Sequence, residues 1–471
     1  MRRTTHSGTR QWTRFAALAM AAVAAALGSN GCGSSGGASG SGGVPGAGGN
    51  GAADGGGGPA GNTGAGGNGT SGTAPAAFGL VSPLAGSSAQ PLTPMLAWDS
   101  SDGAASYKIE IATAPTFGVA NVLTQSVNAP TTALSVAAST LTAGVIYYWR
   151  VTAVNPAGST IASGAPLRFS SPYVVAGANG IAVTPDGTRL VVASDVNSGP
   201  IEVITLATHA VAASISTGVA SQPMGIAISP DGTQALATLL TSGNGGVNGI
   251  AVIDLGTNTL TRNLSDPCVG TTLSDVAYFP TGTQAAIPDL SGGCSAMGLS
   301  TFSPASASTF AFVNFNDTND PFGVAVSPNG AFALVTMALD KKVYKVTFPG
   351  TVTPIAMPSE SAGVAITPDG MTAVVAGTDL YAITLSNNAV TTIPLTNDSP
   401  GGDFHNLAVT PDGAHAVVVG ASTIQIVALA SDTVVGSYPA TGGTNLAISP
   451  DGHTAFVTDR INGWVRVLQI P

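Results

Sequence analysis

The stretch Ile181-Ala-Val-Thr-Pro-Asp-Gly187 decides the fold, because versions of it recur along the rest of the chain. Its apolar-Ala-apolar start is typical of a buried β-strand. In the turn that follows, proline presets φ, aspartate bonds the local backbone and glycine accepts a positive φ. The stretch therefore predicts a strand that ends in a tight hairpin.

Six further copies of this phrase follow, and their prolines are spaced 39 to 50 residues apart. The copies are Ile226–Gly232, Val276–Gly282, Val324–Gly330, Val364–Gly370, Leu407–Gly413 and Leu446–Gly452. Between them lie further apolar segments, such as Leu190–Ala193, Ile201–Thr205 and Val211–Ile215, which complete four strands per repeat. Seven such repeats are typical of a seven-bladed β-propeller.

The last repeat ends after its third strand, Trp464–Gln469, while a spare strand, Ser171–Ala176, precedes the first repeat. We expect this spare strand to complete the last blade. Such pairing closes the ring and removes an exposed sheet edge. The fold class expected for residues 171–471 is therefore all-β, a seven-bladed propeller.

The repeated phrase resembles the YVTN-type propeller repeat. Val252-Ile-Asp254 and Phe456-Val-Thr458 match further parts of that repeat, and the resemblance covers about 300 residues. It implies the propeller fold. It selects no activity, because such propellers include lactonase-like enzymes, cytochrome-like subunits and surface proteins.

Residues 78–170 read as short strands separated by turns, among them Met95–Trp98, Tyr107–Ala112 and Val145–Val154. The last of these alternates, with Tyr147, Trp149 and Val151 expected on one face. This region resembles a fibronectin type III domain in Trp98, in Tyr107 and in Leu141-Thr-Ala-Gly144 before Tyr147, which looks like a tyrosine corner. The resemblance implies an immunoglobulin-like β-sandwich with a spacing or adhesion role.

The N-terminus predicts export. Basic residues precede an apolar run from Phe15 to Leu27, which is too short for a comfortable membrane span. We expect residues 1–31 to be a signal peptide and Cys32 to carry a lipid, with ordinary secretion as the alternative. Residues 32–77 are mostly Gly, Ser, Ala, Asn and Thr, which predicts a disordered tether. The expected location is the outer membrane, the cell surface or the periplasm.

The charges and the cysteines of the chain limit the kinds of partner and of covalent link that we expect. Residues 172–471 carry 20 acidic and 7 basic side chains, so nucleic acid is excluded as an expected partner. The membrane is expected to meet the chain only through lipidated Cys32, and the protein is expected to be a monomer. Cys268 and Cys294 are expected to form a disulfide, because an exported protein meets an oxidising compartment.

The start of each inner strand should border the central pocket of a propeller. Six residues before each proline stand Asn179, Met224, Ser274, Phe322, Ala362, His405 and Thr444. One histidine among small and apolar groups does not make a metal site, so neither metal nor cofactor is expected. We take His405, Asp403, Asn179, Met224, Phe322 and Thr444 as a candidate binding face. The alternative for His405 is a partly exposed loop residue.

Acidic residues gather in the loops expected on that same face. They are Asp195, Asp289, Asp340, Asp379 and Asp459 after second strands, and Asp317, Asp320 and Asp403 before inner strands. Such a set attracts a cation or a basic partner. The alternative is a solvated face, since aspartate is common in turns.

Three hypotheses of function follow. The first is a non-catalytic binding protein that meets a protein or glycan through its loop face. The second is a lactonase-like hydrolase or lyase that uses His405 and a bound cation. The third is a redox accessory, for which the sequence lacks a c-type haem motif and the repeated tryptophans of quinone enzymes. The first is favoured, because the expected pocket holds few groups able to do chemistry.

Overall fold

The structure is a computed structural model that describes residues 72–218, 221–241, 249–265, 274–290, 297–306, 310–317, 319–395, 406–420, 422–440 and 442–471. Cys32, Cys268, Cys294, Asp403 and His405 lie outside these residues, as do the expected signal peptide and residues 32–71 of the expected tether. The end of that tether, residues 72–77, is described: the Ala76 amide donates to the Asp102 carbonyl at 2.9 Å, and Asn155 Nδ2 donates to the Thr73 carbonyl at 2.9 Å. Within the described residues, none of the helical segments has the length and apolar character of a membrane span.

Residues 80–170 form two antiparallel sheets, called here the N-terminal sheet pair. The first sheet has the order β1 (Leu80–Ser82), β2 (Met95–Trp98), β5 (Ala133–Ser135). The second has the order β4 (Asn121–Asn128), β3 (Ser106–Ala112), β6 (Ile146–Asn155), β7 (Gly158–Ile161), and β8 (Leu167–Ser170) also pairs with β6. One short 3-10 helix, η1 (Gly118–Ala120), precedes β4.

The core of the N-terminal sheet pair follows from the alternation in β6. Tyr147, Trp149 and Val151 are buried on one face, as the sequence predicts, and the residues between them are partly exposed. They pack with Trp98 and Tyr107 from β2 and β3. Burial of such aromatic side chains is a large apolar contribution to stability.

The rest of the described chain forms four-stranded antiparallel sheets, numbered here sheets 1 to 7 and together called the ring. Sheet 1 is β10 (Ala178–Val183), β11 (Arg189–Ser194), β12 (Pro200–Thr205) and β13 (Ala210–Ser216). Sheet 2 is β14 (Ser221–Ile228), β15 (Gln234–Thr241), β16 (Gly249–Asp254) and β17 (Thr259–Leu264). Sheet 3 is β18 (Ala277–Tyr278), β19 (Ala285–Leu290), β20 (Met297–Phe302) and β21 (Phe310–Asn314).

The remaining sheets repeat this order. Sheet 4 is β22 (Pro321–Val326), β23 (Phe332–Met337), β24 (Lys342–Thr347) and β25 (Thr351–Ala356). Sheet 5 is β26 (Val364–Ile366), β27 (Thr372–Ala376), β28 (Leu380–Thr384) and β29 (Ala389–Ile393). Sheet 6 is β30 (Asn406–Val409), β31 (His415–Val419), β32 (Thr423–Ala428) and β33 (Thr433–Pro439). Sheet 7 is β34 (Gly443–Ile448), β35 (Thr454–Asp459), β36 (Trp464–Gln469) and β9 (Tyr173–Val174).

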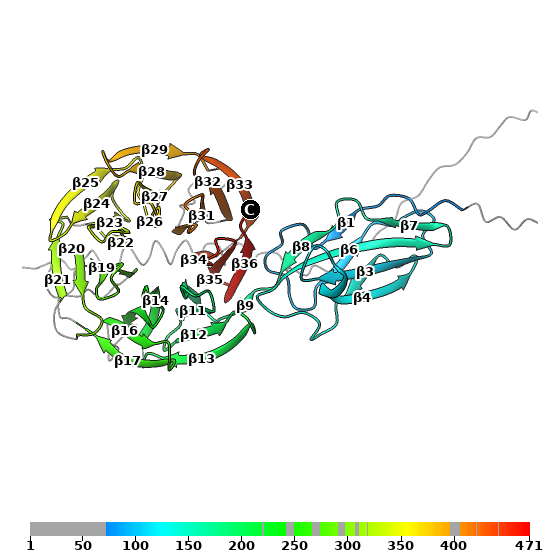
Figure 1. Cartoon of the computed structure of the whole chain (residues 1–471), viewed down its shortest axis with the longest axis horizontal. Coiled ribbons are helices and arrows are strands. Elements are labelled where there is room, and N and C mark those ends of the chain that lie inside the picture. Colours follow the sequence, from blue (N-terminus) through cyan, green and yellow to red (C-terminus); the bar gives the residue numbers. More distant parts are fainter. Residues whose placement is uncertain are drawn as a thin grey trace, which may run out of the picture. The chain divides into compact units, whose positions relative to one another are not determined.

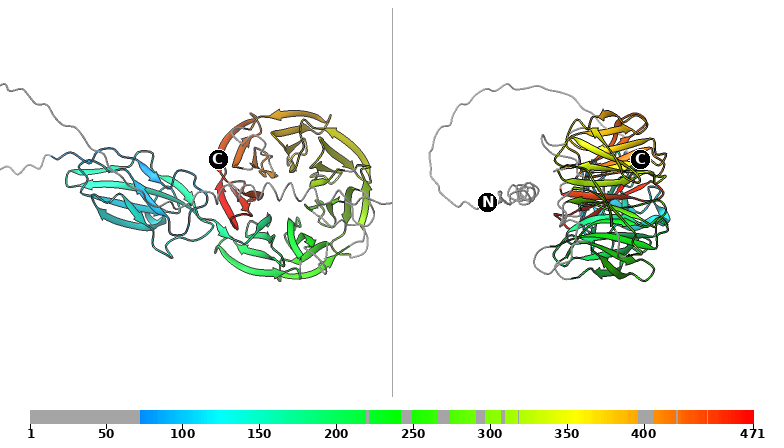
Figure 2. Two further views of the ribbon diagram at one scale, coloured as in Figure 1. Left: turned by 180° about the vertical axis from the view of Figure 1, so that it is seen from behind. Right: turned by 90° about the vertical axis from the view of Figure 1, so that its left-hand side faces the viewer.

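The second strand of each sheet is apolar on both faces, because it packs against a sheet on each side. In β11, Leu190 and Val192 pack toward sheet 7, whereas Val191 and Ala193 pack toward sheet 2. This explains continuous apolar runs such as Leu-Val-Val-Ala in place of strict alternation. The sheets surround a common axis, with the first strands nearest to it and the fourth strands outermost (Figure 1). Figure 2 shows the same arrangement from behind.

The contacts between first strands follow the chain order and then return to the start. β10 contacts β14, and each first strand contacts the next until β34 contacts β10. The closing strand expected at Ser171–Ala176 is confirmed, since Tyr173 pairs with Val465 and Val174 with Trp464. The ring is therefore closed by joining its N-terminal and C-terminal strands in sheet 7.

Candidate functional site

The described members of the candidate binding face all lie at the start of first strands. Asn179 is in β10, Met224 in β14, Phe322 in β22 and Thr444 in β34. Asn179 is buried, and the other three are partly exposed. We call this side of the ring the loop face, and the side that carries the Pro-Asp-Gly turns the turn face.

Only some of these residues meet. Asn179 Nδ2 lies 3.5 Å from the sulfur of Met224, which joins sheets 1 and 2. Thr444 Oγ1 is instead 2.9 Å from Thr458 Oγ1 of its own sheet. For Phe322, the backbone carbonyl accepts a hydrogen bond of 2.5 Å from Ser274 Oγ in sheet 3.

A chain of three amides crosses the loop face, and we call it the amide chain: Asn406, Asn445 and Asn179. Asn406 Nδ2 donates to Asn445 Oδ1, and Asn445 Nδ2 donates to Asn179 Oδ1 at 2.7 Å. These bonds link sheets 6, 7 and 1 near the axis. Asn406 and Asn445 remain partly exposed, so the amide chain is accessible from solvent.

The amide chain ends in an ion pair. Asn179 Nδ2 donates to Asp195 Oδ2 at 3.2 Å, and Arg460 Nε lies 2.6 Å from the same oxygen. Burial raises the pKa of Asp195, although Arg460 and Asn179 oppose the rise. The side chain of Arg460 is 46% exposed, so the buried carboxylate is neutralised by a group that reaches the surface.

Other loop-face aspartates also have partners in their own sheets. Asp459 Oδ2 is fully buried and bonds Arg466 Nη2 at 2.6 Å and Asn462 Nδ2 at 2.8 Å. Asp289 Oδ2 accepts a bond of 2.8 Å from Ser300. Asp379 Oδ1 accepts a weaker bond of 3.4 Å from the Leu395 amide.

Sheet 4 holds the densest of these groups. Tyr344 OH donates to Asp317 Oδ2 at 2.7 Å, and Lys342 Nζ lies 2.7 Å from Asp340 Oδ2 and 3.4 Å from Asp317 Oδ2. The bond to Asp340 raises the pKa of Lys342, so the ammonium stays charged among the carboxylates. Burial raises the pKa of nearby Asp320. Lys342 thus pairs with two of the three aspartates of sheet 4, Asp317 and Asp340.

Asp275 precedes β18 in sheet 3. It stands five residues before the turn proline of its repeat, the same position as Asn406 and Asn445 in sheets 6 and 7. Its Oδ2 accepts a 3.0 Å bond from the Val324 amide in sheet 4, and its Oδ1 accepts a 2.8 Å bond from the Val276 amide. Burial raises the pKa of Asp275 to about 6, and the two amide bonds oppose the rise. The sequence prediction did not include Asp275, Asn406 and Asn445. They stand five residues before the turn proline, whereas the predicted strand-start residues stand six before it.

Three threonines of second strands were also missed. Thr238, Thr336 and Thr458 are fully buried, and each hydroxyl accepts a bond of 2.8 to 2.9 Å from a first-strand amide. They are placed where the first strand bulges, so the hydroxyl replaces a lost ladder bond. Only β23 shows this in the sequence, as a single threonine within an otherwise apolar strand, whereas β15 and β35 contain further polar residues.

The turn face has a cleft of about 410 Å³ lined by Asp186, Arg189, Asp231, Thr233 and Asp254, together with Gly232 and Gly256. Its aspartates serve their own turns. Asp186 Oδ1 and Asp231 Oδ1 each accept a 3.0 Å bond from the amide two residues on. The serine or threonine two residues before each aspartate also donates to it, which lowers the pKa of both carboxyls. In the part of the chain that the structure describes, no three His, Cys, Asp or Glu side chains gather as a metal site requires.

Comparison with solved structures identifies the fold. Kuenenia stuttgartiensis hydrazine synthase superposes with a TM-score of 0.55 at 18% identity, over 63% of this chain and 96% of that one. The β-propeller domain of Myceliophteria thermophila Cps50 (Swd1) gives a TM-score of 0.53 at 10% identity, over 64% of this chain and 99% of that one. No family model and no curated protein sequence matches the chain. At these identities the likeness concerns the fold alone, and the repeated four-stranded sheets of this chain form a β-propeller.

Proposed function

We propose that this chain is an exported, lipid-anchored protein that binds a partner, without catalysis, through the loop face of a seven-bladed β-propeller. The partner is a protein or a glycan that presents neutral hydrogen-bonding groups. In this proposal the protein stays monomeric at the cell envelope, and its N-terminal sheet pair is a fibronectin type III-like sandwich.

The proposed blade number is supported by contacts between neighbouring turns. A β-carbon on the glycine of each turn would lie 3.3 to 3.7 Å from Cδ of the proline of the turn before it. The pairs are Gly232 with Pro185, Gly282 with Pro230, Gly330 with Pro280, Gly370 with Pro328, Gly413 with Pro368, Gly452 with Pro411, and Gly187 with Pro450. The YVTN-type resemblance is consistent with the same count.

The fibronectin type III-like assignment is supported by two features. The Thr142 amide donates to Tyr147 OH at 2.7 Å, five residues upstream, as in a tyrosine corner. Trp98 and Tyr107 pack with their ring centroids 5.6 Å apart in the core. Both features involve residues that carry the resemblance in the sequence.

Export and anchoring are supported by the composition of the N-terminal 77 residues. Arg2, Arg3, Arg10 and Arg14 precede the apolar run, and Cys32 follows it at the start of the glycine-rich stretch. An oxidising compartment would favour the disulfide between Cys268 and Cys294.

The amide chain is the observation that carries the binding proposal. Asparagine amides neither titrate nor act as nucleophiles, but each offers two donors and an acceptor. Asn406 and Asn445 each donate one side-chain hydrogen bond to the next asparagine, and among the described residues the second N–H of each amide has no acceptor. Their positions are fixed by neighbours in three sheets, which lowers the entropic cost of binding. Such groups suit sugar hydroxyls or peptide amides.

Binding is tested with purified protein on a glycan array and on an array of purified envelope proteins. Wild-type protein should bind a specific ligand, and Asn445→Ala combined with Asn406→Ala should weaken that binding by about tenfold or more. Asn387→Ala is the matched control, because Asn387 lies in a turn between third and fourth strands, away from the loop face. Equal binding by the double variant and wild type contradicts the proposal.

The lactonase-like alternative is tested by the metal content of the purified protein. Stoichiometric divalent metal that is lost in His405→Ala would overturn the non-catalytic proposal. Release of the protein from the membrane fraction by Cys32→Ser tests the proposed anchor.

A further inference from the structure

Few backbone pairs join the two strands that close the ring, β9 and β36. β9 contributes two residue pairs, Tyr173 with Val465 and Val174 with Trp464, and one further bond of 2.9 Å runs from the Val175 amide to the Gly463 carbonyl. The fourth strands of the other sheets have five to seven residues. Beyond Val465, the outer edge of β36 therefore has no strand partner among the described residues.

Side chains of the N-terminal sheet pair occupy that edge. Ser170 Oγ donates to the Val467 carbonyl at 2.7 Å. Arg168 Nη1 donates to Gln469 Oε1 at 2.5 Å, and Tyr148 OH donates to the same oxygen at 3.3 Å. We call Tyr148, Arg168 and Ser170 the clasp; they come from β6 and β8, which pair with each other.

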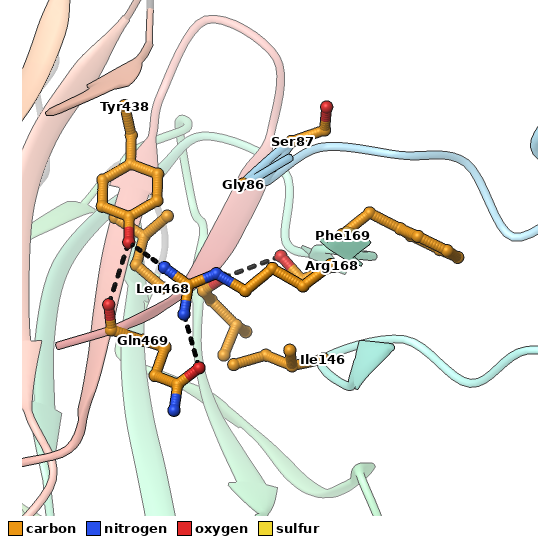
Figure 3. A pocket seen from close by; sticks show the side chains of 10 residues that line it. Gly86, Ser87, Ile146, Arg168, Phe169, Tyr438, Leu468 and Gln469 are labelled. Carbon is orange, nitrogen blue, oxygen red and sulfur yellow. Dashed lines mark hydrogen bonds between the residues drawn. The ribbon is translucent and has the colours of Figure 1, made fainter. Parts of the chain in front are cut away.

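Arg168 also ties the last two sheets together. Its Nη2 donates to Tyr438 OH at 2.7 Å, and that hydroxyl donates to the Gln469 carbonyl at 3.0 Å (Figure 3). Tyr438 belongs to β33 of sheet 6 and Gln469 to β36 of sheet 7. The hollow between these groups has a volume of only about 10 Å³, enough for about one water molecule. The contact is therefore closely packed as well as hydrogen-bonded.

A second contact supports the closing strand itself. A β-carbon on Gly144, in the turn before β6, would overlap the ring of Tyr173. Ala143 and Ile146 pack against the cluster that contains Tyr173 and Val465. Tyr173 OH is 2.9 Å from His209 Nδ1, in the turn between β12 and β13 of sheet 1. The N-terminal sheet pair thus braces both strands of the closure.

We propose that the N-terminal sheet pair is a structural part of the ring closure, in which the clasp holds β36 where a full fourth strand is missing. Only Ser171 and Pro172 separate β8 from β9, so any strain between the N-terminal sheet pair and the ring falls on this closure. The guanidinium of Arg168 makes charge-assisted bonds, which are stronger than bonds between neutral groups. A load on a tethered, ligand-bound protein is then shared by the clasp and does not fall on two backbone pairs alone.

The test is hydrogen exchange of the full-length protein, read by mass spectrometry in peptides that cover residues 173–176 and 464–470. In Arg168→Ala these amides should exchange about tenfold or more faster, because a charge-assisted bond to each of two partners is lost. Arg189→Ala is the control, since the Arg189 guanidinium bonds the Leu255 carbonyl between sheets 1 and 2. The control should leave exchange at residues 464–470 unchanged.

The proposal is overturned if Arg168→Ala speeds exchange only within residues 78–170, or if the control changes residues 464–470 equally. Should Arg168→Ala fail to fold, Gln469→Ala provides the second readout, because it removes the acceptor and keeps the arginine. Protection at 173–176 that is unchanged in Gln469→Ala would also overturn the proposal. Ligand binding through the amide chain is measured separately, so failure of one proposal leaves the other standing.

Discussion

Pro450 lies against Gly187: its Cδ is 3.6 Å from the place that a β-carbon on Gly187 would take. The proline belongs to the last repeated phrase and the glycine to the first. The turn residues therefore have a tertiary role besides their local one. The glycine of each turn lies close to the proline of the turn before it in the sequence. The contact between Gly187 and Pro450 joins the first turn to the last.

Gly187→Ala should lower the free energy of unfolding by about 1–2 kcal/mol, because Gly187 has φ of +70° and a β-carbon disfavours that conformation. The distance to Pro450 is an ordinary contact, so the cost comes from the backbone. Gly187→Asn should cost less, since asparagine tolerates positive φ. Urea unfolding of the two variants measures both. An asparagine variant as unstable as the alanine variant would contradict this explanation.

Gly144→Ala should cost more, about 2–5 kcal/mol, because it combines positive φ with overlap on the Tyr173 ring. Gly164→Ala is the matched control, since Gly164 has φ of +73° and no atom within 4 Å of its β-carbon position. It should cost about 1–2 kcal/mol. The difference between the two variants in urea unfolding measures the contact with Tyr173, and equal costs would mean that the contact carries no strain.

The repeat and its turns are predictable from sequence because their causes are local. Asp186 accepts a hydrogen bond from the Thr188 amide two residues on, and Gly187 adopts the positive φ that the turn requires. The pairing of Tyr173 with Val465 is predictable from the number of strands. The last repeat has three strands instead of four, and one unassigned strand precedes the first repeat.

The amide chain is not predictable in that way, because its members meet only after sheets 6, 7 and 1 pack together. A weak signal exists five residues before each proline, where Gly180, Gly225, Gly323 and Gly363 stand. A β-carbon there would touch the neighbouring first strand, as Gly363 would touch Asn406. The other residues of this column, Asp275, Asn406 and Asn445, break the glycine pattern and bond across the same gap.

Asp275 should titrate with a pKa of about 6, whereas turn aspartates such as Asp186 and Asp231 should titrate below 3.8. Burial raises the pKa of Asp275, so between about pH 3.8 and 6 the native state binds more protons than the unfolded state. The contribution of Asp275 to the free energy of unfolding therefore falls as pH rises through that range. Carboxyl carbon NMR of labelled aspartate measures the titration.

Asp275→Asn is the assignment control for this titration, because the resonance that titrates near pH 6 should vanish in it. Asp254→Asn should leave that resonance in place, since Asp254 is a partly exposed residue at the end of β16 whose pKa is lowered by a hydrogen bond from the Thr257 amide. A set of aspartate resonances that all titrate below about pH 4 would show that Asp275 is solvated.

Reduction should destabilise the protein if Cys268 and Cys294 are joined. A closed loop of 26 residues contributes about 3.5 kcal/mol in the chain-entropy description. Peptide mass mapping without reductant should find the two cysteines in one linked peptide. Cys268→Ser should abolish both the link and the effect of reductant on urea unfolding, and a free thiol at Cys294 in the wild type would refute the pairing.

His209 should make the closure sensitive to acid. Burial lowers the pKa of His209 below its ordinary 6.5, while in the unfolded chain it titrates near 6.5. Between these two values the unfolded state binds more protons, so the free energy of unfolding rises with pH and is lost as pH falls. His209→Asn should flatten the dependence below pH 6.5, since the titrating group is removed and asparagine suits the φ of +56° at this position. A slope that stays the same in His209→Asn would mean that another group senses the acid.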